Sequence, residues 1–331
     1  MANQLAIATV SLGQHPSHTL DRKILAAAKA GFNGLEIVFS DLDAYSQSQN
    51  LSIFEGAEKI TALCNQSNLE ILSLAPFENY EGDNSPLSSR LQKATLWMEV
   101  ARRLHAPYLQ IPSHYGPDAD GDTAVIISEL QQIADLGSSR QPLVSIAYEA
   151  LSWGTRCSTW EDALKVVNAV DRPNFGLCLD NFHVVTKLWA DAFALSGKFS
   201  DADRRLKETL YRFIESCPLN KVFFIQLSDG EKSDPPFSKD HPWYVEGEAP
   251  QFTWSRHARP FPLEKGLGAY MPMTEIAQTW LVEKGYKGWV SLETFDRRMR
   301  DEANGPEDSA RRGMESWNKL CMKLKASKAN I

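Results

Sequence analysis

The sequence predicts an α/β protein built as a closed (β/α)₈ TIM barrel, and three observations support this prediction. Short apolar runs alternate with segments of helical periodicity along the whole chain, eight of each. Strict alternation of this kind is typical of parallel sheets with right-handed crossovers. Four of the apolar runs also end in a side chain that carries a ligand oxygen. Such ends meet at one mouth when the sheet closes into a barrel.

The first half of the chain contains four strand–helix pairs. Each strand is an apolar run, and each helix carries apolar residues three or four positions apart. The turn Ala30-Gly31-Phe32 ends the first helix, because glycine readily adopts the left-handed C-terminal conformation. The predicted pairs are Leu5–Ser11 with Leu20–Lys29, Leu35–Phe39 with Glu55–Gln66, Ile71–Phe77 with Leu87–Leu104, and Tyr108–Pro112 with Thr123–Leu136.

The second half repeats the pattern with strands that are apolar almost throughout. A continuous apolar run such as Phe175–Asp180 indicates a strand buried on both faces, as in a parallel sheet. The turn Lys284-Gly285-Tyr286 separates the seventh helix from the last strand. The predicted pairs are Val144–Glu149 with Thr159–Val170, Phe175–Asp180 with Ala202–Ser216, Val222–Leu227 with Met273–Lys284, and Trp289–Phe295 with Pro306–Lys325.

One stretch interrupts the alternation. Residues 230–271, after the seventh strand, show little periodicity and are rich in Pro, aromatic and charged residues. A loop of this length on the carboxyl side of a barrel strand is often functional. The alternative of an open nucleotide-binding sheet is weaker, because no glycine-rich phosphate-binding motif follows any strand. No linker is visible, so residues 1–331 are predicted to form a single barrel domain with a long seventh loop.

The composition is that of an ordinary globular protein. The chain has 331 residues, of which 43% are hydrophobic and 23% charged. A formal net charge of −7 disfavours a nucleic-acid partner. No apolar run is long enough to predict a membrane span, and the N-terminus does not resemble a signal peptide. Five dispersed cysteines favour reduced thiols and a cytoplasmic location, while self-association as a homo-oligomer is left open.

Oxygen-bearing side chains end the last four predicted strands: Glu149, Asp180, Gln226 and Glu293. Neighbouring strands lie about 5 Å apart, so four successive ends can surround one ion. Three carboxylates and an amide oxygen suit Mg²⁺ or Mn²⁺, with water or substrate as further ligands. A zinc site is disfavoured, because no Cys set or multi-His set accompanies them. Taken singly, each residue would more often be a surface or ion-paired group.

Two histidines follow predicted strands. His183 lies three positions after Asp180. It is a candidate general base or a residue that supports the metal ligands. His114 follows the fourth strand alone and is expected to be structural.

The long loop ends in a segment with a serine and two arginines in an aromatic frame, including Ser255 and Arg259. Arginine binds a substrate carboxylate through two parallel hydrogen bonds, which is one interpretation of this segment. The other is that the arginines tether the loop to the barrel rim. Glu36 on the second strand and Glu78 after the third point to the same rim, and the sequence assigns neither a role.

Several motifs resemble those of a known family. They surround Glu149 (Ala-Tyr-Glu-Ala-Leu-Ser-Trp-Gly), Asp180 (Cys-Leu-Asp-Asn-Phe-His), Gln226 (Ile-Gln-Leu-Ser-Asp), Arg259 (Trp-Ser-Arg-His-Ala-Arg) and Glu293 (Val-Ser-Leu-Glu-Thr-Phe). They are similar to the xylose isomerase-like TIM barrels, the sugar phosphate isomerase/epimerase superfamily. More narrowly, they resemble the 3-dehydroshikimate dehydratases, especially the single-domain fungal members. The Trp-Ser-Arg…Arg element and the long seventh loop are the most specific features.

The resemblance implies a metal-dependent lyase that dehydrates 3-dehydroshikimate to protocatechuate through a metal-stabilised enolate, in quinate and shikimate metabolism. It implies a divalent metal, Mg²⁺ or Mn²⁺, with four ligands: Glu149, Asp180, Gln226 and Glu293. It makes His183 the candidate base, and Arg259, helped by Ser255, the group that holds the substrate carboxylate. A divalent-metal keto-sugar isomerase or epimerase on the same barrel is the alternative, and it would need no such arginine. A repair endonuclease is disfavoured, because it should show a multi-His zinc cluster and a basic face.

Overall fold

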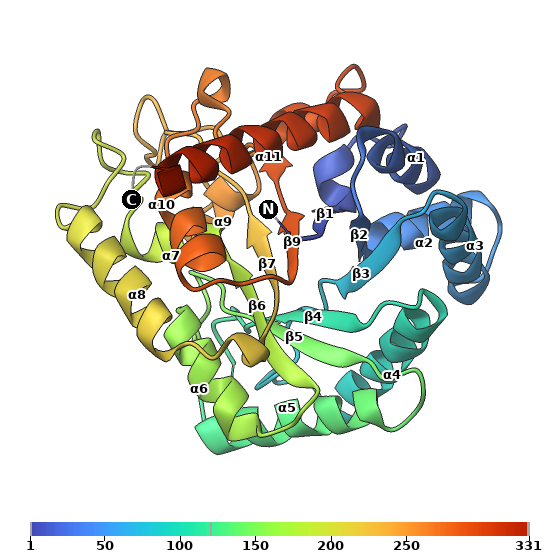
Figure 1. Cartoon of the computed structure of the whole chain (residues 1–331). Helices are drawn as coiled ribbons and strands as arrows, with labels where there is room; N and C mark the ends of the chain where they lie inside the picture. Colours follow the sequence, from blue (N-terminus) through green and yellow to red (C-terminus); the bar gives the residue numbers. More distant parts are fainter. Residues whose placement is uncertain (1, 120, 330–331) are drawn as a thin grey trace.

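Parallel β-strands close into one barrel in the computed structural model, which describes residues 2–119 and 121–329. The eight barrel strands of this part of the chain follow the order β1-β2-β3-β4-β5-β6-β7-β9, and β1 pairs with β9 to close the sheet (Figure 1). Their bounds are β1 Leu5–Ala8, β2 Gly34–Val38, β3 Glu70–Ala75, β4 Tyr108–Pro112, β5 Ser145–Glu149, β6 Phe175–Asp180, β7 Val222–Leu227 and β9 Trp289–Leu292. The predicted (β/α)₈ barrel is confirmed.

Helices surround the barrel (Figure 1). The α-helices are α1 Leu20–Ala30, α2 Phe39–Ser48, α3 Ile53–Gln66, α4 Leu87–Arg103, α5 Thr123–Ser138, α6 Trp160–Val170, α7 Asn181–Leu188, α8 Ala202–Ser216, α9 Pro250–Ser255, α10 Met273–Ala277 and α11 Pro306–Ala329. The shorter turns are the 3₁₀ segments η1 Thr9–Leu12, η2 Leu219–Lys221, η3 Lys265–Leu267 and η5 Arg297–Arg300, and the π-helical η4 Gln278–Glu283. In the described part of the chain, no helix has the length and apolar character needed to cross a membrane.

Local signals explain several helix ends. Ser52 caps α3 through a reciprocal pair of hydrogen bonds with Glu55, which satisfies two N-terminal donors. Gly31 ends α1 in the left-handed conformation at φ 93°, as the sequence predicted. Asp180 ends β6 and also caps α7, because its Oδ1 accepts the N–H of Phe182 at 2.7 Å. This double role leaves Oδ2 of Asp180 for other partners.

The sequence prediction missed helices that begin at barrel strand ends. Both α2 and α7 start at the residue that follows a strand, and α2 begins at Phe39, which was predicted to end the strand Leu35–Phe39. The predicted last strand Trp289–Phe295 is interrupted, because β9 ends at Leu292. The chain then forms β10, Phe295–Asp296, which pairs antiparallel with β8, Ala258–Arg259. The predicted seventh helix is also split, into α10 and the π-helical turn η4.

The long seventh loop is more ordered than its sequence indicated. It contains α9, β8 and η3 between β7 and α10. Asp229 fastens both ends of this loop, because its carboxylate accepts the backbone N–H groups of Gly230, Leu263 and Met271 at 2.8–3.0 Å. The β8–β10 ribbon then joins the loop to the chain that leaves β9. Together these contacts hold the last third of the loop against the barrel mouth.

The barrel interior is divided into an apolar layer and a polar layer. A small cluster fills its lower part: Ala6, Leu72, Ala147, Cys178 and Phe224. Above it, toward the carboxyl ends of the strands, buried polar side chains replace the apolar ones: Glu36, Gln110, Glu149, Gln226 and Ser291. The much larger core lies between the strands and the surrounding helices. The polar layer at the carboxyl ends therefore forms the floor of a candidate site.

A buried glutamate connects three segments behind this polar layer. Glu81, in the loop after β3, accepts hydrogen bonds on Oε1 from the Tyr148 hydroxyl of β5 and the His114 N–H, both at 2.8 Å. Its other oxygen has no hydrogen-bond partner among the described residues. Burial raises the pKa of Glu81 to about 7. The ring of His114 contacts Asp83 at 3.2 Å, in agreement with its expected structural role.

The raised pKa of Glu81 predicts a specific pH dependence of stability. The folded protein holds this proton more tightly than the unfolded chain, so stability falls as pH rises through the interval between the two pKa values. Glu81→Gln cannot titrate. Between pH near 4 and pH near 8, the unfolding free energy of wild type should therefore fall by about 3 kcal/mol more than that of Glu81→Gln. Urea unfolding across this range measures the difference. Glu78→Gln, at an exposed carboxylate, is the control, and identical pH profiles for Glu81→Gln and wild type would contradict the prediction.

Candidate metal centre

All four oxygen-bearing residues predicted from the sequence lie at the carboxyl end of the barrel. Glu149 and Asp180 are the last residues of β5 and β6, and Gln226 is the next to last of β7. Glu293 follows the end of β9 directly. In the sheet register Asp180 lies opposite Gln226, and Gln226 lies opposite Ser291, two residues before Glu293. The neighbouring strands thus bring these side chains to one end of the barrel.

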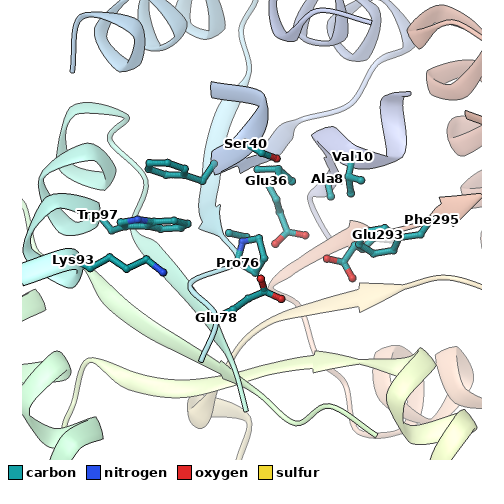
Figure 2. A pocket seen from close by; sticks show the side chains of 13 residues that line it. Ala8, Val10, Glu36, Ser40, Pro76, Glu78, Lys93, Trp97, Glu293 and Phe295 are labelled. Carbon is teal, nitrogen blue, oxygen red and sulfur yellow. The ribbon is translucent and has the colours of Figure 1, made fainter. Parts of the chain in front are cut away.

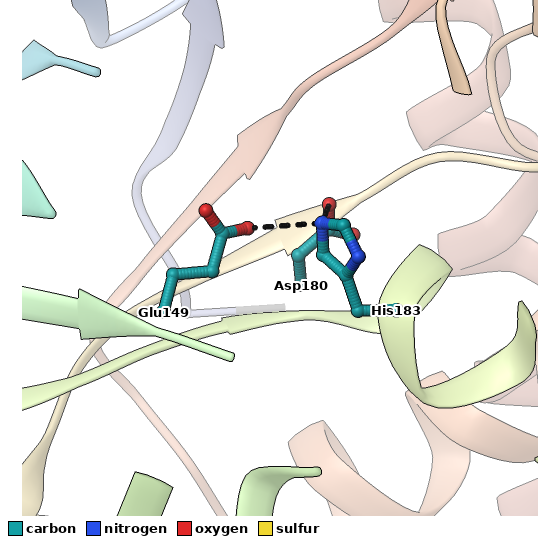
Figure 3. Close-up of side chains that lie close together, drawn as sticks. All are labelled: Glu149, Asp180 and His183. Atoms are coloured by element: carbon teal, nitrogen blue, oxygen red, sulfur yellow. Dashed lines mark ion pairs between the residues drawn. The ribbon is translucent and has the colours of Figure 1, made fainter. Parts of the chain in front are cut away.

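Three buried side chains form a group that could hold a metal ion: Glu149, Asp180 and His183 (Figure 3). Their ligand atoms all lie within 4.8 Å of one another. His183 Nε2 is 3.5 Å from both Glu149 Oε1 and Asp180 Oδ2. Helix α7 starts immediately after Asp180, and this places His183 in its first turn beside the two carboxylates.

The carboxylate of Glu149 has one satisfied and one unsatisfied oxygen. Its Oε2 accepts a hydrogen bond from the side chain of Gln110 on β4. Its Oε1 is buried without a hydrogen-bond partner among the described residues. Burial raises the pKa of Glu149 well above its usual range, and the charges of Glu293 and Asp180 raise it further. A buried carboxylate oxygen without a donor is costly, and a cation would satisfy it.

Gln226 is held by Glu36, a residue to which the sequence assigned no role. The amide Nε2 of Gln226 donates to the two carboxylate oxygens of Glu36 at 3.1 and 3.2 Å. Its Oε1 accepts from Cys178 Sγ at 3.2 Å. Glu36 is buried and also accepts from Ser73 Oγ at 2.9 Å, and burial raises its pKa. These bonds fix the position of the Gln226 amide at the floor of the centre.

Arg259 contributes the positive charge at the centre. Its side chain is 1% exposed, and its Nη2 lies 2.7 Å from Asp180 Oδ2 and 3.3 Å from Glu293 Oε2. It also donates to Ser228 Oγ and, through Nη1 at 3.2 Å, to Ser255 Oγ. Of the two sequence-based interpretations, a tether to the rim therefore describes its contacts in this structure. These contacts bring Arg259 and Ser255 to the same place as two of the predicted ligands.

Acidic side chains outnumber basic ones at this centre in the described part of the chain. The acidic side chains are Glu36, Glu149, Asp180 and Glu293, and Arg259 pairs with the last two of them. Burial raises the pKa of Glu293 to about 8; the charges of Asp180 and Glu36 contribute, while Arg259 acts in the opposite direction. Clustered carboxylates in a low-dielectric interior are stabilised by a bound divalent cation. The donor set therefore fits a hard divalent metal.

The hydrogen bonds of His183 determine which nitrogen carries its proton. The backbone N–H of Ser152 donates to Nδ1 at 3.0 Å, so Nδ1 is the acceptor and the neutral ring is protonated at Nε2. Burial lowers the pKa of His183 to about 4. The ring packs edge-on against Trp153 with centroids 4.7 Å apart. The Nε2–H group of the neutral ring therefore lies 3.5 Å from one oxygen each of Glu149 and Asp180, without a hydrogen bond to Glu149 Oε1.

A cavity of about 420 Å³ adjoins the centre (Figure 2). It lies over the carboxyl ends of β1, β2 and β3. Glu36 of the polar layer and Glu293, directly after β9, both line it. Its walls are mainly apolar, with Trp97 stacked on Phe39 at a centroid distance of 4.0 Å. The cavity is large enough for a small substrate next to the carboxylates.

Sequence reasoning missed three residues that complete the centre. Gln110 contacts Glu149, Ser228 contacts Arg259, and Ser152 contacts His183. Gln110 could have been found because it is the one amide inside the apolar run Tyr108–Pro112. Ser228 could have been found as the polar residue directly after the predicted strand Val222–Leu227. No sequence signal marks the backbone donor of Ser152.

Comparisons with known proteins identify relatives of the chain. The family model described as xylose isomerase-like TIM barrel matches residues 24–320. A protein named 3-dehydroshikimate dehydratase from Neurospora crassa is 36% identical and aligns over 98% of this chain and 95% of its own length. A protein of the same name from Pseudomonas aeruginosa is 33% identical over 90% of this chain, which spans only 39% of that relative.

A solved structure agrees with these sequence relatives. The xylose isomerase-like TIM barrel/4-hydroxyphenylpyruvate dioxygenase fusion protein is 26% identical with a TM-score of 0.75, and the match covers 99% of this chain and 44% of that one. The family match and the fungal relative both extend over nearly the whole sequence. The chain therefore belongs to the xylose isomerase-like TIM-barrel family, together with the 3-dehydroshikimate dehydratases that it resembles in sequence.

Proposed function

We propose that this chain dehydrates 3-dehydroshikimate to protocatechuate as a metal-dependent hydro-lyase. The observation that carries the proposal is the near full-length identity of 36% with the Neurospora crassa protein of that name. The buried group of Glu149, Asp180 and His183 beside a cavity supports it. The alternative, a keto-sugar isomerase on the same barrel, has no comparable near full-length relative among these matches. No specific observation favours that alternative.

The proposal includes Mg²⁺ or Mn²⁺ held by the four residues predicted from the sequence: Glu149, Asp180, Gln226 and Glu293. Support comes from their position at adjacent strand ends, the unsatisfied Oε1 of Glu149 and the surplus of buried carboxylates. Such an ion, when bound, supplies Lewis-acid stabilisation of the negative charge that develops on the substrate oxygen. His183 lies close enough to serve as an additional or alternative ligand if its protonated nitrogen changes.

His183 is proposed to act on the substrate. The predicted role as general base requires a free lone pair on Nε2, but the Ser152 N–H bond to Nδ1 places the proton on Nε2. In this tautomer His183 donates a hydrogen bond to an oxygen of the substrate that gains charge. Action as a base would require a shift to the other tautomer, with Nδ1–H facing the Ser152 N–H.

Arg259 and Ser255 are proposed as the remaining active-site residues. Arg259 holds the carboxylates of Asp180 and Glu293 and offsets their charge, and Ser255 fixes one arm of the guanidinium. Phe252 of α9 packs near Trp153, which contacts His183, so the seventh loop also covers one side of the centre. These contacts explain why the loop and the barrel have to act together.

The wider proposal concerns the setting of the enzyme. We infer that residues 1–331 act as one barrel domain on a small-molecule substrate in the cytoplasm, without a nucleic-acid or membrane partner. The net charge of −7 supports the absence of a nucleic-acid partner. The five cysteines are all free, and four of them are buried, which fits a reducing compartment.

Turnover with added metal tests the proposed reaction. The purified protein, stripped with a chelator and reloaded with Mg²⁺ or Mn²⁺, is expected to convert 3-dehydroshikimate to a product that absorbs in the near ultraviolet. Chelator treatment alone should abolish the reaction and reloading should restore it. The absence of turnover with either metal would reject the reaction, and full activity of the stripped protein would reject the metal requirement.

Glu149→Gln tests the metal centre. The substitution keeps the shape of the side chain but removes the charge that a divalent ion needs. We expect kcat/KM to fall by roughly 100-fold or more and metal affinity, measured by calorimetry, to weaken. Glu81→Gln is the matched control, since it neutralises a buried carboxylate behind the same strand without contact to the centre. Wild-type activity of Glu149→Gln would be incompatible with the assignment.

Arg259→Lys tests the arginine at the centre. A lysine keeps the charge, but its single ammonium cannot contact Asp180, Glu293 and two serines together. A loss of roughly 100-fold in kcat/KM, about 3 kcal/mol, is expected in steady-state assays. Arg256→Lys, at a half-exposed arginine that pairs with Glu248, should remain close to wild type. Equal activity of the two variants would refute a special role for Arg259.

A further inference from the structure

The cavity beside the centre has an uneven distribution of charge. Its charged lining residues in the described part of the chain are three carboxylates and one ammonium: Glu36, Glu78, Glu293 and Lys93. Lys93 and Trp97 line one side, and Glu293 and Phe295 line the opposite side (Figure 2). Among these four charged residues, only Lys93 would attract an anionic substrate. The cavity therefore favours one orientation of a substrate that carries a single carboxylate.

Lys93 is held in place by aromatic rings and not by a carboxylate. It lies on α4, with Nζ 5.0 Å from the ring centroid of Phe77 and 5.8 Å from that of Trp97. Among the described residues, no carboxylate lies within ion-pair distance of this ammonium. Glu78, which shares the cavity, instead accepts a hydrogen bond from Tyr115 at 3.0 Å. The charge of Lys93 is thus available to a ligand.

Arg259, the other cationic side chain near the centre, already pairs with protein groups. Arg259 is 1% exposed and directs its donors to Asp180, Glu293, Ser228 and Ser255. It is also absent from the residues that line the cavity. To bind a substrate carboxylate it would have to leave buried carboxylates without their partner, which is costly. The sequence predicted that Arg259 binds the substrate carboxylate. Lys93, which lines the cavity, is a more accessible partner for that group.

We infer that Lys93 binds the carboxylate of the substrate and thereby fixes its orientation in the cavity. The inference rests on the proposed function, because 3-dehydroshikimate carries one carboxylate on its ring. With that group at Lys93, the ring lies along the wall formed by Trp97 and Phe39. Its oxygen substituents then face Glu293 and the metal centre. Lys93 is in this sense a substrate-binding residue that determines specificity for carboxylates.

Kinetics of Lys93→Met test the inference in the Mn²⁺-loaded enzyme. Methionine keeps the length of the side chain but removes its charge, so KM for 3-dehydroshikimate is expected to rise roughly tenfold or more. Lys93→Arg should recover most of the affinity. Lys59→Met, at an exposed lysine of α3 outside the cavity, is the matched control and should keep the wild-type KM. An unchanged KM for Lys93→Met, or a fall in kcat alone, would overturn the inference.

Binding of two related ligands separates this inference from the proposed reaction. Protocatechuate and catechol share the same pair of hydroxyl groups, and only protocatechuate has a carboxylate. The wild-type protein should prefer protocatechuate by roughly tenfold or more in calorimetric titrations, and Lys93→Met should lose this preference. If Lys93→Met loses the preference and the wild type shows no turnover, the proposed reaction is rejected but the role of Lys93 is supported. Turnover by wild type with an unchanged preference in Lys93→Met would reject Lys93 alone.

Discussion

The ion pair of Arg259 with Asp180 and Glu293 is the interaction on which the centre depends. It is buried, and it brings together three segments far apart in the chain: the end of β6, the end of β9 and the seventh loop. A buried guanidinium of this kind lowers the cost of gathering several carboxylates in the interior. It does not balance them, since Glu36 and Glu149 lie in the same polar layer. The fold thus gathers more carboxyl groups than one guanidinium can pair with, and a divalent cation would stabilise their charged forms.

The remaining contacts follow from this imbalance. Each buried acid has a polar neighbour that fixes its position: Gln110 for Glu149, Ser73 and Gln226 for Glu36, and the α7 backbone for Asp180. The apolar cluster below supports this layer and separates it from solvent at the other end of the barrel. Orientation of the carboxylates is therefore built into strands and a helix start, and not left to flexible loops.

Much of this arrangement could be predicted from the sequence, and the reasons are physical. Continuous apolar runs that end in Glu149 or Asp180 mark buried parallel strands, and strand alternation with helices marks the barrel. The hydrogen bonds of Glu36 with Gln226 and of Gln110 with Glu149 could not be deduced, because strands buried on both faces show no alternation of polarity. The short helices α2 and α7 were not predicted, because both start directly at a strand end with no turn residues between strand and helix. The ion pair of Arg259 depends on the folded course of a loop that has no periodicity.

The β8–β10 ribbon has an evolutionary consequence. Phe295 pairs with Arg259 in that ribbon, so the segment after Glu293 fixes the position of the arginine. Asp229 holds the two ends of the loop together through its hydrogen bonds to backbone N–H groups. Loop residues that contact neither Arg259 nor Asp229 can change in number or identity without displacing the guanidinium. Changes in this part of the loop would therefore alter the entrance of the site and leave the position of Arg259 unchanged.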